Sequence, residues 1–160
     1  MNINIRKAAE DDFPAILSMI KELAEFEKSS DKVTNSIDQM TVERAYFNCF
    51  IAETEEREIV GIALYFFAYY SWVGKSLYLE DIYIKKQFRR QKIGTELLNK
   101  IFEVAREEQC KRVRWQVLDW NTGAIEMYSK SGAEIDTHWL NCTFDHDGIK
   151  NFNKGPGSLK

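Results

Sequence analysis

Cysteine and histidine are scarce in this sequence of 160 residues. The three cysteines, Cys49, Cys110 and Cys142, are odd in number and far apart, which fits neither a disulfide framework nor the clustered ligands of a zinc site. Neither of the two histidines, His138 and His146, neighbours a serine or cysteine in a nucleophile turn. The sequence therefore predicts reduced thiols and no metal, and it does not support a hydrolase triad.

Long apolar runs and an excess of positive charge are also missing. The longest apolar run, residues 59–70, is too short for a membrane-spanning helix and contains Gly61. The first residues lack the apolar stretch of a secretory signal, so a cytoplasmic location is expected. The net charge of -3 argues against a large nucleic-acid surface, which needs a basic face. We therefore expect neither a membrane nor a nucleic acid as a partner.

The composition, with 44% hydrophobic and 29% charged residues, is typical of one globular domain. We expect this domain over residues 1–149 and a flexible tail over residues 150–160. Hydrophobic periodicity predicts helices near residues 12–27, 36–46, 93–109 and 121–131. It predicts strands near residues 3–5, 47–53, 59–70, 77–84, 112–119 and 139–144. This order is typical of a mixed α/β or α+β domain.

A basic turn, residues 88–95, lies between a predicted strand and the strongest amphipathic helix of the chain. Free backbone amides and the partial positive charge of a helix N-terminus can hold a pyrophosphate there. Gly94 would allow a close approach, and Arg90 and Lys92 add positive charge. The alternative is an ordinary solvated basic turn before a helix.

Two adjacent carboxylates, Glu80 and Asp81, interrupt the otherwise apolar strand that leads into this turn. Strand alternation predicts that they lie on opposite faces, so that at least one points into a partly enclosed space. Desolvation would raise the pKa of such a carboxyl, which could then act as a base. The alternative is that both carboxylates face water at a strand end.

A third segment, residues 117–128, is expected to open a helix at Asn121. Asn121, Ile125 and Tyr128 stand at i, i+4 and i+7, so the cap amide and the phenol share one helix face and could flank one ligand. A phenol can donate a proton to a leaving thiolate. The alternative is that Tyr128 is a core aromatic residue at helical spacing.

Together these segments resemble the GNAT superfamily of N-acetyltransferases in its acetyl-CoA-binding strand, its Gln/Arg-x-x-Gly-x-Gly/Ala turn and its later Asn-to-Tyr helix. Residues 22–28, 77–84 and 117–128 resemble the diamine (spermidine/spermine) and thialysine branch, and residues 25–28 and 117–121 favour its thialysine members. The resemblance covers the chain up to about Phe144. It implies a single GNAT-type domain with a central, mixed, mostly antiparallel twisted sheet flanked by about four helices, and it implies a homodimer.

The resemblance also implies roles for individual residues. Tyr128 would be the general acid for the CoA thiolate, and Glu80 would accept the proton of the amine. The small cationic amine would be bound by Phe26, Glu27, Glu80 and Asp81. Acetyl-CoA would pair with the backbone of Ile82, Tyr83 and Ile84 through its pantetheine arm, and it would contact Arg89, Arg90, Gln91, Lys92, Ile93, Gly94, Thr95, Asn121, Thr122, Gly123 and Ala124. The expected reaction is direct transfer without a metal.

Two departures from the family pattern bear on these roles. Lys92 replaces the first glycine of the turn motif, so its backbone must fit without a positive φ or its side chain must turn away from the pyrophosphate. Tyr70 and Ser71 stand where the polyamine enzymes carry an Asp-Pro pair, which removes an acidic group. Two other functions stay open: acetylation of a protein or peptide amine, and a CoA-binding module without turnover.

Overall fold

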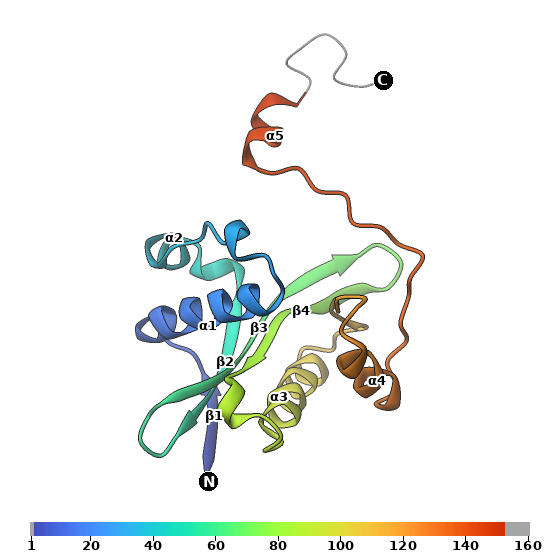
Figure 1. Ribbon diagram of the computed structural model, residues 1–160. Coiled ribbons are helices and arrows are strands. Elements are labelled where there is room, and N and C mark those ends of the chain that lie inside the picture. Colours follow the sequence, from blue (N-terminus) through green and yellow to red (C-terminus); the bar gives the residue numbers. More distant parts are fainter. Residues whose placement is uncertain (1, 153–160) are drawn as a thin grey trace. The chain divides into compact units, whose positions relative to one another are not determined.

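The computed structural model describes residues 2–152 (Figure 1). The chain divides into two compact units, Met1–Gln116 and Val117–Lys160. The first unit holds the whole β-sheet and three of the helices, and the second holds two helices joined by extended chain.

The sheet of the first unit has five strands in the order β1-β2-β3-β4-β5. The first four are antiparallel neighbours: β1 (Ile3–Lys7), β2 (Asn48–Thr54), β3 (Ile59–Tyr70) and β4 (Gly74–Ile84). The last strand, β5 (Val113–Arg114), runs parallel to β4. The sheet is therefore mixed and mostly antiparallel, as predicted.

Helices cover both faces of this sheet (Figure 1). One face packs on α1 (Phe13–Phe26) and α2 (Ile37–Val42) around a core that includes Ile16 and Met19. The other face packs on α3 (Ile93–Glu107), whose Leu97 and Ile101 are fully buried. This three-layer arrangement follows from the helical spacing of apolar residues on α1 and α3.

Local signals explain where the helices begin. The helix α1 starts after the short 3-10 turn Glu10–Asp12 and has Pro14 in its first turn, where a missing N–H costs nothing. At α2, the hydroxyl of Ser36 accepts a hydrogen bond from the backbone N–H of Gln39 at 3.1 Å. The predicted second helix is therefore confirmed, although α2 ends at Val42 and a 3-10 turn, Arg44–Tyr46, completes the segment.

The second unit contains α4 (Thr122–Lys130) and α5 (His146–Asn151). The helix α4 is confirmed close to its predicted bounds, whereas α5 was not predicted. The expected tail at residues 150–160 overlaps α5 at Lys150 and Asn151, and its residues 153–160 lie outside the described part of the chain.

Two predicted strands are wrong in part or in full. The strand predicted at residues 112–119 pairs only at Val113 and Arg114, because alternation identifies a possible strand and does not supply a partner edge. The strand predicted at residues 139–144 does not form in the described chain. Trp139 and Leu140 are 68% and 88% exposed, so this segment has no buried face that would fix a register.

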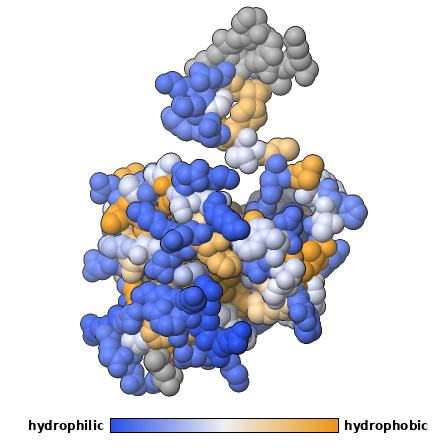
Figure 2. Space-filling model, viewed as in Figure 1, coloured by the Kyte–Doolittle hydropathy of each residue, from blue (hydrophilic) through white to orange (hydrophobic). Residues whose placement is uncertain are grey.

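Hydrophilic residues predominate on the face of the molecule shown in Figure 2, with smaller hydrophobic patches between them. Among the described residues, no helix is long and apolar enough to cross a membrane.

Candidate active site

One edge of β4 is open over its second half. The strand β5 pairs with β4 only at Leu77 and Tyr78, while β3 follows the opposite edge as far as Ile84. Within residues 2–152, no strand pairs with Leu79 to Ile84 on the β5 side. Backbone N–H and C=O groups that point to this edge are therefore available to an extended ligand, except the carbonyl oxygen of Ile84, which accepts a hydrogen bond from Nε of Arg89. The predicted pantetheine-binding residues 82–84 lie on this stretch.

A β-bulge interrupts β4 beside the open edge. Leu64 of β3 lies opposite Asp81, and the next residue, Tyr65, lies opposite Leu79. Glu80 therefore has no residue opposite it and is the extra residue of the bulge.

The bulge corrects the predicted orientation of the two carboxylates. Leu79 belongs to the core cluster of α3 and Ile82 packs against it, although strict alternation would put these two residues on opposite faces. Asp81 lies opposite Leu64, which packs against the α1 core. Glu80 and Asp81 therefore lie on the same face of the sheet, the face that α1 covers, and the prediction of opposite faces was wrong because a period of two cannot anticipate an inserted residue.

Glu27, at the C-terminal end of α1, joins these two residues in an acidic cluster (Glu27, Glu80 and Asp81). Burial, the negative charge of Glu80 and then that of Glu27 raise the pKa of Asp81 to about 6. Burial alone raises the pKa of Glu80, much of whose side chain is still exposed, and the pKa of Glu27. No ion pair within residues 2–152 involves these three carboxylates. The acidic cluster therefore carries negative charge that a cation could neutralise.

The basic turn leads from a 3-10 turn, Lys86–Phe88, into α3. Lys92 is the N-cap residue and has φ 65°, and Arg90 has φ 63°. Lys92 therefore adopts a positive φ, as a glycine can. Of the two alternatives given for Lys92, the one without a positive φ is wrong, and the other, a side chain turned away from the phosphates, stays a prediction. A side chain in this left-handed region costs about 1 kcal/mol or more. The family motif did not predict that Arg90 would be a second non-glycine residue with a positive φ.

The glycine of this turn has a packing role that the structure makes visible. A Cβ atom at Gly94 would lie 3.2 Å from Cδ1 of Ile84, so glycine lets the first turn of α3 approach the end of β4. The first backbone N–H groups of α3 have no partner within the helix, and no side chain of residues 2–152 caps them. These amides are free to receive an anionic group.

The second unit carries the remaining predicted site residues on and before α4. The side-chain oxygen of Asn121 accepts a hydrogen bond from the N–H of Ala124 at 3.3 Å, which confirms Asn121 as the N-cap. Thr122 and Gly123 form the exposed first turn. Tyr128 is buried, and burial raises the pKa of its phenol, which therefore stays protonated near neutral pH.

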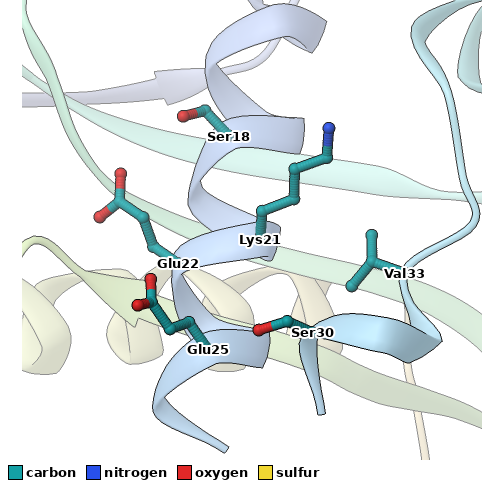
Figure 3. A pocket seen from close by; sticks show the side chains of 6 residues that line it. All are labelled: Ser18, Lys21, Glu22, Glu25, Ser30 and Val33. Carbon is teal, nitrogen blue, oxygen red and sulfur yellow. The ribbon is translucent and has the colours of Figure 1, made fainter. Parts of the chain in front are cut away.

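A polar groove of about 340 Å³ lies along the exposed side of α1 (Figure 3). Ser18, Lys21, Glu22 and Glu25 line it from α1, and Ser30 and Val33 line it from the following segment. Glu22 connects this groove to β4, because its Oε2 accepts a hydrogen bond from the hydroxyl of Tyr83 at 3.0 Å. Sequence reasoning missed this contact, since nothing in the local pattern pairs residues 61 positions apart.

Comparison with known proteins decides the family. The model of the acetyltransferase (GNAT) family matches residues 5–133. The chain belongs to this family. Its expected class, an acetyl-CoA-dependent N-acetyltransferase, and its expected fold class are therefore confirmed. Among the described residues, no group of three or more His, Cys, Asp or Glu side chains could hold a metal ion.

Relatives of this GNAT protein include named amine acetyltransferases. The thialysine N-epsilon-acetyltransferase of Mus musculus is 39% identical over 160 residues, which cover 91% of this chain and 94% of the mouse protein. The Caenorhabditis elegans protein of that name is 40% identical over 129 residues, covering 79% of this chain and 80% of its own. A solved integron cassette protein of V. cholerae is 18% identical with a TM-score of 0.76, covers 97% of this chain and 99% of its own, and supports the fold alone.

Proposed function

We propose that this GNAT acetyltransferase transfers the acetyl group of acetyl-CoA to the primary amine of a small cationic substrate, with thialysine or a lysine-like amino acid as the first candidate. The observation that carries the proposal is the acidic cluster beside the open edge of β4, which has no ion-pair partner within residues 2–152. The names of the mouse and nematode relatives support the same substrate class.

The acidic cluster suits both tasks that an amine acceptor requires. A primary amine has a pKa of roughly 10.4 and reaches the site as a cation, which must be bound and then deprotonated. Glu80 is our candidate for the proton acceptor, directly or through water, and Glu27 and Asp81 hold the cation. With a pKa of about 6, Asp81 is ionised at neutral pH and is a stronger base than an ordinary aspartate. Phe26, at the end of α1 and 45% exposed, would contact the apolar part of the substrate.

In the first unit, the residues proposed to hold acetyl-CoA suit an elongated thioester with a phosphate group at one end. The open edge at Ile82 to Ile84 offers backbone groups to the amide-bearing arm. In the turn from Arg89 to Thr95, the uncapped N–H groups at the start of α3 would bind the pyrophosphate. Asn121 to Ala124 would contribute further contacts, and Tyr128 would protonate the departing thiolate, because its phenol stays protonated near neutral pH.

The far end of β4 favours a short acceptor over a long polyamine. The guanidinium groups of Arg112 and Arg114 lie over the ring of Tyr70, at 5.2 and 5.8 Å from its centre. Tyr70 stands where the polyamine enzymes have an acidic residue, so this region presents positive charge. A second ammonium group of a polyamine would be repelled there, whereas the carboxylate of an amino acid would not.

The decisive experiment measures CoA release from acetyl-CoA with thialysine, lysine, ornithine, putrescine, spermidine and a lysine-containing peptide as acceptors. We expect the highest kcat/KM with thialysine or lysine, and a loss of at least about 100-fold in Glu80→Gln. Tyr128→Phe should lower kcat far more than it weakens acetyl-CoA binding. Acetylation of the peptide alone would contradict the proposal, as would acetyl-CoA binding without turnover of any acceptor.

We also propose that the enzyme is a homodimer whose interface includes the apolar side chains of residues 139–152. Leu140, Phe144 and Ile149 are 88%, 63% and 68% exposed, and Figure 2 shows hydrophobic atoms beside hydrophilic ones around α5. Such a segment gains stability when a second chain covers it. Light scattering should give twice the chain mass of 18.7 kDa, and the mass of Leu140→Asp should fall toward that of the monomer.

A further inference from the structure

Arg89 heads the basic turn, yet its guanidinium group is engaged on the acceptor side of the first unit. Its Nε donates a hydrogen bond to the carbonyl oxygen of Ile84 at 3.0 Å. Its Cζ lies 5.5 Å from the centre of the Tyr83 ring and 5.7 Å from that of the Phe26 ring. One side chain therefore contacts both the end of β4 and the last residue of α1.

Tyr83 makes a second connection between the same two elements. Its ring contacts Arg89, and its hydroxyl donates to the carboxylate of Glu22, one turn before Phe26 on α1. Figure 3 shows Glu22 on α1, next to Glu25 on the same side of the helix. The C-terminal part of α1 is thus attached to β4 directly at Glu22 and, through Arg89, at Phe26.

This attachment helps to determine where the last residues of α1 lie. Glu27 follows Phe26 directly, and its N–H donates to the carbonyl oxygen of Leu23 at 2.9 Å, so it moves with the last turn. Phe26 and Glu27 are not in the buried core, whereas Ile16 and Met19, earlier on α1, are fully buried. Core packing holds α1 as far as Leu23 and Ala24, and polar and cation–π contacts add to it at Glu22 and Phe26.

We propose that Arg89 is a positioning residue for the acceptor amine, because its guanidinium fixes the last turn of α1 and with it the carboxylate of Glu27. This inference rests on the proposed function. A planar guanidinium can lie over two aromatic rings while it donates to a carbonyl group, and an ammonium group cannot reproduce that geometry. Arg89 thereby links the turn that would receive the phosphates to the side that would receive the amine.

The test is Arg89→Lys, which keeps the charge and the backbone amide and removes the planar group. With each substrate varied separately, we expect the KM of the amine to rise about fivefold to tenfold and the KM of acetyl-CoA, which Arg89 is also proposed to contact, to rise by a clearly smaller factor. Arg90→Ala, in the same turn, should raise the KM of acetyl-CoA more than the KM of the amine. Arg106→Lys, on the exposed end of α3, should change neither constant.

Phe26→Leu provides the second arm, since it removes one of the two rings at a half-exposed position and leaves the core intact. It should raise the KM of the amine as well, and the effects of Arg89→Lys and Phe26→Leu should combine to less than their product, because both break one contact. A rise confined to the KM of acetyl-CoA in Arg89→Lys would overturn the inference. So would independent, fully multiplicative effects of the two substitutions.

A readout without turnover separates this inference from the proposed function. If the end of α1 moves in Arg89→Lys, Asp81 loses part of the influence of Glu27, and its pKa, followed by carboxyl NMR, should fall, as we also expect for Glu27→Gln. An unchanged titration of Asp81 would count against the positioning role even in a wild-type protein that acetylates no small amine. Inactivity of the wild type toward the whole acceptor panel would contradict the proposed function alone.

Discussion

The first unit contains two groups of clustered carboxylates with opposite electrostatic states. In the Arg6 network (Arg6, Asp12 and Glu53), Nη1 and Nη2 of Arg6 lie 2.7 Å from the carboxylates of Asp12 and Glu53. The hydrogen bond from Arg6 holds the pKa of Asp12 below its usual value. The acidic cluster also consists of carboxylates, but no cationic side chain within residues 2–152 pairs with them. The pKa values of all three carboxyl groups are raised.

The difference separates a structural role from a functional one. Asp12 is 8% exposed and is satisfied by Arg6 and by the N–H of Ala9, so its charge stabilises the fold. The acidic cluster costs folding free energy in the free protein, and that cost makes sense if a substrate cation supplies the missing charge. Unpaired, partly buried carboxylates are therefore the better guide to the site than the number of acidic residues.

The largest effect is expected at Arg6. Arg6→Ala would leave Asp12 and Glu53 partly buried without their cation, and we expect the free energy of unfolding to fall by about 2–4 kcal/mol at pH 7. Urea denaturation measures this loss. Because the folded-state pKa of Asp12 is lowered, the contribution is fully present above the usual pKa of 3.8 and is lost as the pH falls through the lowered value.

Arg106→Ala is the matched control, since Arg106 is exposed in the last turn of α3, and it should change stability by no more than about 0.5 kcal/mol. Equal losses of unfolding free energy in the two variants would show that the Arg6 network has no special structural role. The contrast between this network and the acidic cluster would then fail.

The opposite change in the free energy of unfolding is expected when Asp81 is replaced. Its pKa is raised from the usual 3.8 to about 6, so its favourable contribution to stability is fully present below pH 3.8 and is lost as the pH rises through 6. Asp81→Asn should therefore increase the free energy of unfolding at pH 8 by roughly 1–3 kcal/mol and change it little at pH 4. The same substitution should raise the KM of the amine.

Asp31→Asn, at an exposed position after α1, controls for the loss of one negative charge and should change neither quantity. A destabilised Asp81→Asn at pH 8 would mean that Asp81 has a structural partner, and the contrast with Asp12 would fail.

Much of the fold followed from the sequence because its signals are local. Apolar residues at helical spacing on α1 and α3, and the charged turn between β2 and β3, each specify their element without knowledge of a partner. The family was also predicted from three motifs and is confirmed. The roles of individual site residues, the homodimer, the expected lack of a metal, the cytoplasmic location and the partners that we expected to be absent stay predictions.

What the sequence could not predict depends on contacts between distant segments. The bulge at Glu80 exists only in the pairing of β4 with β3, so alternation assigned the wrong face to one carboxylate. The positive φ values of Arg90 and Lys92 belong to residue types that rarely adopt them. Residues 139–144, which contain Trp139, Leu140 and Phe144, suggested a strand, but an exposed segment that pairs with no described strand has nothing to hold it extended in a sheet.

The smallest effect tests whether the acidic cluster is one electrostatic unit. Glu80→Gln and Glu27→Gln should each lower the pKa of Asp81, because each removes a neighbouring negative charge, by on the order of half a pH unit or less. Glu80 should have the larger effect, since its influence on Asp81 exceeds that of Glu27. Carboxyl NMR titration of Asp81 measures both.

Glu25→Gln is the matched control for Glu27→Gln, because Glu25 is exposed two residues earlier on α1 and is not among the groups that act on Asp81. In the Arg6 network the same titration should move the other way, with the pKa of Asp12 rising in Arg6→Ala. If Asp81 titrates identically in all three glutamine variants, its raised pKa comes from burial alone. In that case the three carboxylates would not act together on a bound cation, and Asp81 alone would attract it. A role for Glu27 at the amine would then need evidence other than its membership of the acidic cluster.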